Sequence, residues 1–369
     1  MTDRTTGLSA DASSRVPLPP PRVAGESVLA PKPTDRPKWE HLAPGSGEPL
    51  GAGLDVPTPV VGAGLTAVGG KVRVGDRIFA AMSSGAAGFI IVLVVLIATF
   101  LVVKSLPSIL ADKDNILTST NWQTTPGDLR FGLANLLWVT VIISIVAMVI
   151  AVPVAIGVAL CITQYAPRGL SKPIAYVLDL LAAIPSIVYG IWGAFVLSPE
   201  LEPVQRLLGH IPLPLFDNLQ TRDTIFNGAV VLSVMILPII TAISRDVFER
   251  TPRANIEAAL ALGATKWEMI RIAVLPFGRA GVVSGAMLGL GRALGETIAV
   301  YLIVSTVSPP FRSSIFTGGE TIASKIANGS AEFNNAASTG AYIAAGLALF
   351  ILTFLVNSAA RAIVNRKQV

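Results

Sequence analysis

The feature that most constrains this chain is a series of long apolar segments. The stretch from Phe89 to Val103 contains no charged side chain. A helix needs about 20 mostly apolar residues to cross roughly 30 Å of hydrocarbon. Segments of this kind lie at 78–104, 131–163, 174–198, 225–244, 279–304 and 339–360. Because only helices satisfy their own backbone inside lipid with such sequences, the pattern predicts an all-α, polytopic membrane protein with six transmembrane helices.

The composition supports a membrane protein over a nucleic-acid-binding one. Only 14% of the 369 residues are charged, whereas soluble domains carry about 25%. The net charge of +5 could indicate nucleic acid, but the basic residues lie between apolar segments instead of forming one solvated surface. One cysteine allows no intrachain disulfide, and the two histidines, His41 and His210, lie far apart in sequence. We therefore expect no nucleic acid partner, no metal and no other cofactor.

The distribution of lysine and arginine predicts the orientation of the chain. Fourteen of them flank the segments on one side of the expected membrane and six on the other. Cytoplasmic loops carry the excess of basic residues, so both termini are expected in the cytoplasm. The loops on the opposite side, near 105–130, 199–224 and 305–338, are too short for a large extracellular domain, and capture of a substrate is expected to fall to another protein.

The first 70 residues differ from the rest of the chain. They contain eleven prolines, many glycines and few large apolar residues. Such a segment buries too little surface to offset the entropy of ordering, so residues 1–70 are predicted to form a disordered cytoplasmic tail, and 75–369 the transmembrane domain. The run Pro19-Pro20-Pro21 could serve as a polyproline ligand, although a solvated tail is the simpler interpretation.

The fifth segment carries two charges near its middle. Arg292 and Glu296 lie four residues apart, so on a continuous helix they share one face. Charged residues at this depth normally face the bundle interior or a water-filled path. The pair could line a translocation pathway, where Arg292 offers donors to an anion and Glu296 holds Arg292 in the absence of the anion. Alternatively, the two could form a permanent ion pair that clamps helices together.

Glycines in the same segment predict that another helix approaches it closely. They occur in two series with a spacing of four residues: Gly281, Gly285 and Gly289, and then Gly291 and Gly295.

The loop at 251–277, between the fourth and fifth segments, predicts a short helix. Thr251 is a suitable N-cap with Pro252 at the first helical position. Gly263 fits the left-handed conformation that ends many helices.

A second short helix is expected directly after the first. Thr265 and Glu268 have the spacing of a capping box, and Pro276 is expected to end this helix before the next span.

The first loop helix ends in small residues, Ala258, Ala259 and Ala261, beside Glu257. Such a compact helix could fit into a cleft of a partner protein and transmit the movement of that partner. The alternative is an amphipathic helix on the lipid interface, and composition does not separate the two.

The loop resembles the EAA loop of bacterial ABC importer permeases. The sequence Glu-Ala-Ala is followed by glycine four positions after the second alanine, and then by Leu275-Pro276. The stretches ALGATKWEMIRIAVLP, GAMLGLGRALGETIAV, LLAAIPSIVYGIWGAFVLSP and PVAIGVAL resemble phosphate importer permeases of the PstC type. This likeness covers about 75–369 and leaves out the proline-rich tail.

The resemblance implies an ABC importer permease fold of the MetI-like type in a bacterial plasma membrane, with inorganic phosphate as substrate and no catalytic residues. It implies that the loop is a coupling helix that docks on an ATPase, and that the charged pair is associated with phosphate passage. The matching residues are Glu257, Ala258, Ala259 and Gly263 in the loop, and Arg292 and Glu296 in the fifth segment. The implied partners are a second permease of the PstA type, two copies of an ATPase of the PstB type, and a phosphate-binding protein of the PstS type.

Three other classes of function are alternatives. An enzyme is disfavoured because the chain has no phosphate-binding P-loop; Gly70-Lys71 comes closest, but Leu65 and Val72 break the pattern. A permease for another oxyanion, such as molybdate or sulfate, shares the EAA loop. A membrane sensor or scaffold for phosphate signalling is compatible with the same segments.

Overall fold

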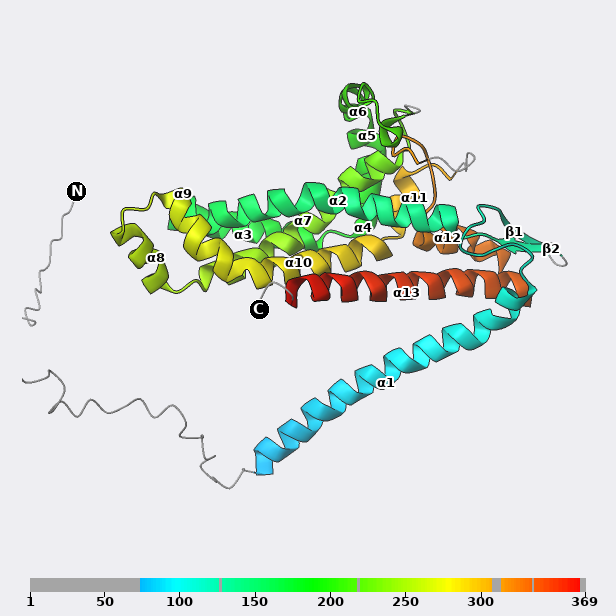
Figure 1. The fold of residues 1–369 in the computed structure, drawn as a ribbon, viewed down its shortest axis with the longest axis horizontal. Coiled ribbons are helices and arrows are strands. Elements are labelled where there is room, and N and C mark those ends of the chain that lie inside the picture. The colour runs from blue at the N-terminus through cyan, green and yellow to red at the C-terminus, as the bar shows by residue number, and fades with distance from the viewer. Residues whose placement is uncertain (1–73, 126–127, 218–219, 307–312, 334, 366–369) are drawn as a thin grey trace, which may run out of the picture. The chain divides into compact units, whose positions relative to one another are not determined.

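The computed structural model of the protein describes residues 74–365 apart from 126–127, 218–219, 307–312 and 334. The tail expected at 1–70 lies outside the described residues. The described part is mainly helical (Figure 1), which confirms the all-α prediction. Its longest elements are α1 (Val74–Ala111), α2 (Ala134–Leu160), α3 (Arg168–Ala183), α7 (Ile225–Glu249), α10 (Leu275–Gly295) and α13 (Ala336–Asn365).

Within the described residues, five helical segments are long and apolar enough to cross a membrane. They are Gly75–Ala111, Ala134–Tyr165, Ile225–Glu249, Lys266–Gly295 and Ala336–Ala362. A sixth would be the pair of α3 with α4 (Ser186–Trp192) and its continuation to Glu200, which is bent by 92°. The six predicted segments are therefore present, but the third is not one straight helix.

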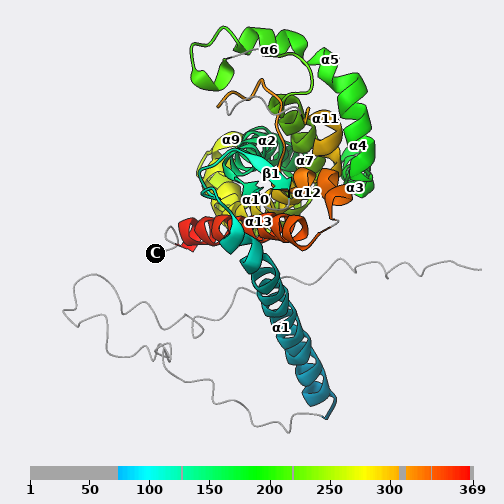
Figure 2. The ribbon, with the colours of Figure 1, turned by 90° about the vertical axis from the view of Figure 1, so that its right-hand side faces the viewer.

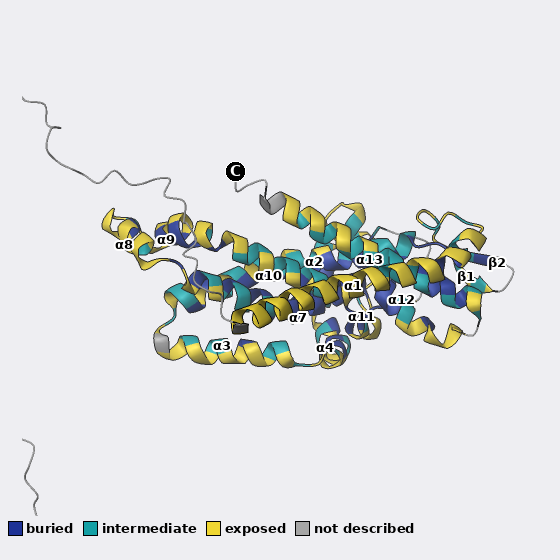
Figure 3. Ribbon diagram, turned by 90° about the horizontal axis from the view of Figure 1, so that it is seen from below, coloured by how far each residue is buried: buried dark blue, intermediate teal, exposed yellow. Residues whose placement is uncertain are grey.

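The centre of the bundle is α7, which packs against α2, α10 and α3 (Figure 2). Most of its apolar stretch is buried, whereas no residue in the most apolar part of α1 is buried (Figure 3). α1 meets α13 at one end of the bundle, where the Ser108 hydroxyl donates to the carbonyl of Ala337 at 3.2 Å. Because the apolar stretch of α1 is not buried by the rest of the chain, we expect α1 to face lipid or another membrane chain.

The first glycine series of α10 produces the close approach that the sequence predicts. A Cβ on Gly281 would lie 2.2 Å from Val247 of α7, and one on Gly289 would lie 2.9 Å from Ile240. The second series does not: a Cβ on Gly291 or Gly295 would meet nothing within 4 Å. α10 therefore buries one glycine face against α7 and leaves another open.

The two ends of the bundle carry different elements (Figure 1). At one end, here called the α8 end, lie α8 (Arg253–Ala261) and α9 (Lys266–Met269). At the other, the hairpin end, an antiparallel hairpin joins β1 (Trp122–Thr125) to β2 (Asp128–Phe131). Hydrogen bonds from Lys113 and Arg130 lower the pKa of Asp128 in this hairpin.

Short helices fill the loops of the hairpin end. Two of them, α5 (Ser198–Glu200) and α6 (Glu202–Leu208), follow α4, and buried Gln205 of α6 is hydrogen-bonded to Asn227 of α7. The last loop contains α12 (Ile322–Asn328), whose first backbone N–H donates to the hydroxyl of Thr140 in α2 at 3.0 Å. These loops are thus folded onto the bundle.

Candidate functional site

The fifth predicted span is broken at its charged residues. α10 ends at Gly295, Glu296 is extended with φ −69° and ψ 128°, and a new helix, α11, runs over Ile298–Ile303. The expectation that Arg292 and Glu296 share one helix face is therefore wrong. The pair lies instead across a helix break, with Arg292 in the last turn of α10.

Glu296 stabilises the start of α11 and does not form an ion pair with Arg292. Its side chain is buried, and its Oε1 accepts a hydrogen bond from the backbone N–H of Ala299 at 3.3 Å. It thus satisfies one of the free donors at the start of α11. The expected ion pair between Arg292 and Glu296 does not form, because the break turns the carboxylate toward α11.

Arg292 is half-buried and makes no hydrogen bond or ion pair with any residue of the described ranges. It lies within electrostatic range of Tyr189 in α4. A guanidinium without a partner offers five N–H donors in a planar fork, which suits oxyanions such as phosphate or carboxylate.

A second helix break lies beside the first. Pro185 separates α3 from α4, and the hydroxyl of buried Tyr189 crosses the break to donate to the carbonyl of Leu181 at 2.8 Å. α4 packs closely on α11, since a Cβ on Gly190 would lie 3.0 Å from the Cα of Ala299. Two interrupted helices therefore meet in the bundle, and backbone of this kind is tolerated at membrane depth only when it is buried or lines a cavity.

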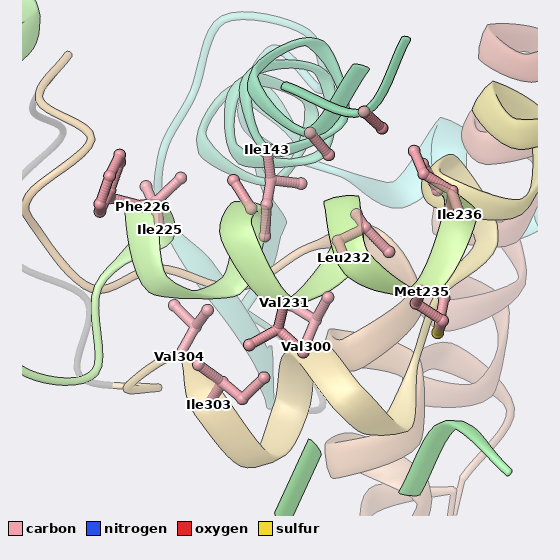
Figure 4. Packing of buried hydrophobic residues seen from close by; sticks show 14 of the residues in the cluster. Ile143, Ile225, Phe226, Val231, Leu232, Met235, Ile236, Val300, Ile303 and Val304 are labelled. Atoms are coloured by element: carbon pink, nitrogen blue, oxygen red, sulfur yellow. The ribbon is translucent and has the colours of Figure 1, made fainter. Parts of the chain in front are cut away.

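The core holds α11 in place (Figure 4). Val300, Ile303 and Val304 point toward α7, where Val231 belongs to the same buried cluster. Gly228 of α7 allows this fit, since a Cβ there would lie 2.8 Å from Val304. The helix that follows the break is thus anchored on α7.

The loop between α7 and α10 contains the predicted pair of short helices, α8 and α9. Gly263 has φ +82°, which confirms the left-handed stop. The N-cap of α8 is Pro252, however, and not Thr251. Thr251 is buried, and its hydroxyl has no hydrogen-bond partner among the described residues.

The second loop helix begins as predicted but does not end as predicted. The capping box is present: the Thr265 N–H donates to Glu268 Oε2 at 2.8 Å, and the Glu268 N–H donates to Thr265 Oγ1 at 3.4 Å. Pro276 does not end this helix. A wider π-helical turn, Ile270–Val274, leads from α9 into α10 without a stop, and Pro276 lies directly after this turn.

The expected coupling residues divide into exposed and buried. Glu257, Ala258 and Gly263 are exposed at the α8 end. Ala259 is buried in a cluster that includes Phe248 of α7. Ala259 therefore attaches α8 to the bundle, while the other three face outward.

Further exposed residues of this loop were not expected from the sequence. Leu262 is 89% exposed and Trp267 is 56% exposed. The ammonium of Lys266 lies 4.6 Å from the ring centre of Tyr165 and so joins α9 to the end of the second span. A large apolar side chain beside a glycine stop is the signal that could have identified Leu262.

Comparisons with known proteins agree with this architecture. Residues 151–369 match the family described as the binding-protein-dependent transport system inner membrane component. The chain therefore belongs to a class of multi-pass inner-membrane permease components.

Two relatives define the family more closely. The phosphate transport system permease protein PstC 2 of Mycobacterium tuberculosis is 52% identical over 302 residues, which cover 80% of this chain and 93% of the relative. The phosphate transport system permease protein PstC of Mesorhizobium japonicum is 37% identical, over 79% of this chain and 90% of the relative. The chain is a member of the PstC family of transport system permeases. A chain in a structure of the inward-facing MetNI methionine ABC transporter matches with a TM-score of 0.44 and 21% sequence identity. The match covers 64% of this chain and 94% of the transporter chain.

Proposed function

We propose that the chain is the transmembrane permease subunit of an ATP-driven phosphate importer. The observation that carries this proposal is the 52% identity to a phosphate transport system permease, over 93% of the length of that relative. Arg292 lies at a helix break inside the bundle and pairs with no residue of the described part of the chain, so it is chemically suited to an oxyanion substrate. No observation favours a molybdate or sulfate permease, or a sensor without transport.

The translocation pathway is proposed to run past the two helix breaks. Arg292 offsets the desolvation of phosphate by charge-assisted hydrogen bonds. Glu296 keeps α11 in place and thereby keeps the break open to substrate. Interrupted helices near the midplane are a recurrent way to expose backbone dipoles and charged groups to a transported ion. The chain supplies one half of the pathway, and a second permease of the PstA type supplies the other.

Coupling to ATP hydrolysis is proposed to occur at the α8 end, which we expect to face the cytoplasm together with both termini because of the excess of basic residues. An ATPase dimer of the PstB type docks on the exposed face of α8, with Glu257, Ala258 and Gly263 in the contact. Ala259 transmits movement of α8 to Phe248 and so to α7. A phosphate-binding protein of the PstS type delivers substrate at the hairpin end.

Uptake of labelled anions tests the assignment of substrate. Cells with and without this chain are compared for uptake of phosphate, sulfate and molybdate. Loss of phosphate uptake alone on deletion, with restoration by the chain, is the expected result. Loss of sulfate or molybdate uptake with phosphate unaffected would contradict it.

A charge reversal in α8 tests the coupling role. In vesicles that contain the complete transporter, Glu257→Arg is expected to leave ATP hydrolysis measurable while phosphate uptake is lost, because the exposed carboxylate meets the ATPase. Glu249→Arg, an exposed glutamate on α7, is the control and should retain uptake. Coupled uptake by Glu257→Arg would remove this residue from the contact.

A further inference from the structure

A cavity lies between the middle of α10 and the last turns of α13, and neither helix break contributes to its lining. It measures about 520 Å³, within the range of about 300–1,000 Å³ that is common for small-molecule sites. Its polar lining residues are Ser284, Asn357 and Arg361, and its larger apolar ones are Val283, Met287 and Leu288. Nothing in the proposed transport mechanism uses this cavity.

We expect the cavity to lie near the level where hydrocarbon gives way to lipid headgroups, because one of its lining residues is at the end of an apolar span. Arg361 is the second-last residue of the apolar span Ala336–Ala362. The C-terminal end of α13 runs beside the first half of α10 (Figure 1), and the shared cavity lining places the two together. Basic side chains at the end of a span normally extend into the headgroup region.

The polar end of the cavity has donors and a positive charge but no carboxylate. The Arg361 guanidinium is exposed and forms no hydrogen bond or ion pair with the residues that the structure describes. The Asn357 amide likewise has no described partner, and the Ser284 hydroxyl already donates to the carbonyl of Ala280 at 2.9 Å. The free donors are therefore those of Arg361 and Asn357, a set that complements a phosphate oxyanion.

The remaining wall is apolar and continues toward the middle of the membrane. Leu288 is 58% exposed and lies one helical turn beyond Ser284. Met287 and Val283 extend the same wall. A free phosphate ion gains nothing from these side chains, whereas an acyl chain attached to a phosphate would cover them.

We propose that this cavity binds an anionic phospholipid from the leaflet at the α8 end. The phosphodiester accepts hydrogen bonds from Arg361 and Asn357, and one acyl chain lies along Val283, Met287 and Leu288. Basic pockets between transmembrane helices are known to hold anionic headgroups. The proposal does not depend on which substrate is transported.

Native mass spectrometry of the complete transporter tests the site. The transporter is purified in mild detergent and incubated with phosphatidylglycerol or with phosphatidylcholine of the same acyl composition. Arg361→Gln is expected to lower the retention of phosphatidylglycerol about fivefold, the contribution of one basic residue near a membrane surface. Phosphatidylcholine carries the same phosphodiester, but its choline cation cancels the net charge, so its retention should be lower in the wild type and should fall less in Arg361→Gln. Arg361→Lys should keep most of the phosphatidylglycerol.

Two further variants distinguish loss of lipid binding in the cavity from a general effect of lost charge or of misfolding. Arg250→Gln removes an exposed arginine at the end of α7, outside this cavity, and should not change retention. Asn357→Leu removes the amide at similar volume and should lower retention even if Arg361→Gln fails to fold. The proposal is overturned by equal retention in wild type, Arg361→Gln and Asn357→Leu, or by equal losses in Arg250→Gln and Arg361→Gln. It is also overturned if millimolar inorganic phosphate displaces the lipid, or if the wild-type transporter retains none.

Discussion

Arg292 is the residue whose placement is hardest to explain by stability alone. An arginine near the middle of a membrane-spanning bundle costs about 3 kcal/mol on insertion scales. The helix dipole stabilises the arginine charge in the last turn of α10 and offsets about 0.3–1 kcal/mol of this cost. Within the described residues no carboxylate pairs with it, which agrees with the proposed contact between Arg292 and the transported anion.

Replacement of Arg292 is expected to reduce phosphate uptake. Arg292→Gln removes charge-assisted hydrogen bonds, so uptake should fall roughly 10- to 100-fold while the assembled complex is recovered in normal amounts. Arg292→Lys keeps the charge without the planar fork and should be intermediate. Arg279→Gln, at the exposed start of the same helix, is the matched control. Normal uptake by Arg292→Gln would leave the residue without a pathway role.

Glu296 is expected to contribute a hydrogen-bond acceptor more than a charge. Glu296→Gln retains an acceptor for the Ala299 N–H and should leave uptake near that of wild type. Glu296→Ala loses it and should destabilise α11 by about 0.5–2 kcal/mol, the usual effect of losing a cap. Thermal unfolding of the purified complex measures the difference. If both variants lose uptake equally with unchanged stability, the negative charge itself takes part in transport.

At the scale of elements, apolar length predicted where the spans lie but not where they are interrupted. Pro185 gave a local signal, since Ile184 before it is driven into an extended conformation and the bend follows. No proline marks the break at Glu296. That break depends on the packing of α11 against α4 and α7, contacts between residues far apart in sequence. The charged residues were therefore found from the sequence, but their mutual geometry was not.

The two glycine series of α10 provide a matched pair of substitutions. Gly281→Ala would place a methyl group 2.2 Å from Val247, so the α7–α10 contact must shift, with a cost of about 1–3 kcal/mol. Gly291→Ala meets nothing within 4 Å and should be neutral, or more stable by up to about 1 kcal/mol through helix propensity. Thermal unfolding of the two variants should separate them. A destabilised Gly291→Ala would indicate that another chain packs on the open face.

At the scale of the whole molecule, the ends of the bundle differ in what they offer to partners. The α8 end exposes a short helix with an apolar tip, and the hairpin end exposes folded loops. The distribution of lysine and arginine predicts that the α8 end faces the cytoplasm, and this prediction uses no knowledge of the architecture. The meeting of α4 and α11 could not be predicted in the same way, because it joins two breaks more than 100 residues apart.

Cysteine labelling can test the orientation, because Cys161 is the only cysteine and its replacement by alanine leaves a cysteine-free chain. Leu262→Cys then marks the α8 end, and Leu117→Cys, at a position 66% exposed, marks the hairpin end. A membrane-impermeant maleimide should label Leu117→Cys in intact cells and Leu262→Cys only in inverted vesicles. A permeant maleimide should label both. The docked ATPase should slow labelling of Leu262→Cys in the vesicles, and its removal should restore the rate, since this side chain lies beside the expected contact. Labelling of Leu262→Cys in intact cells would reverse the proposed orientation and exclude ATPase docking on α8.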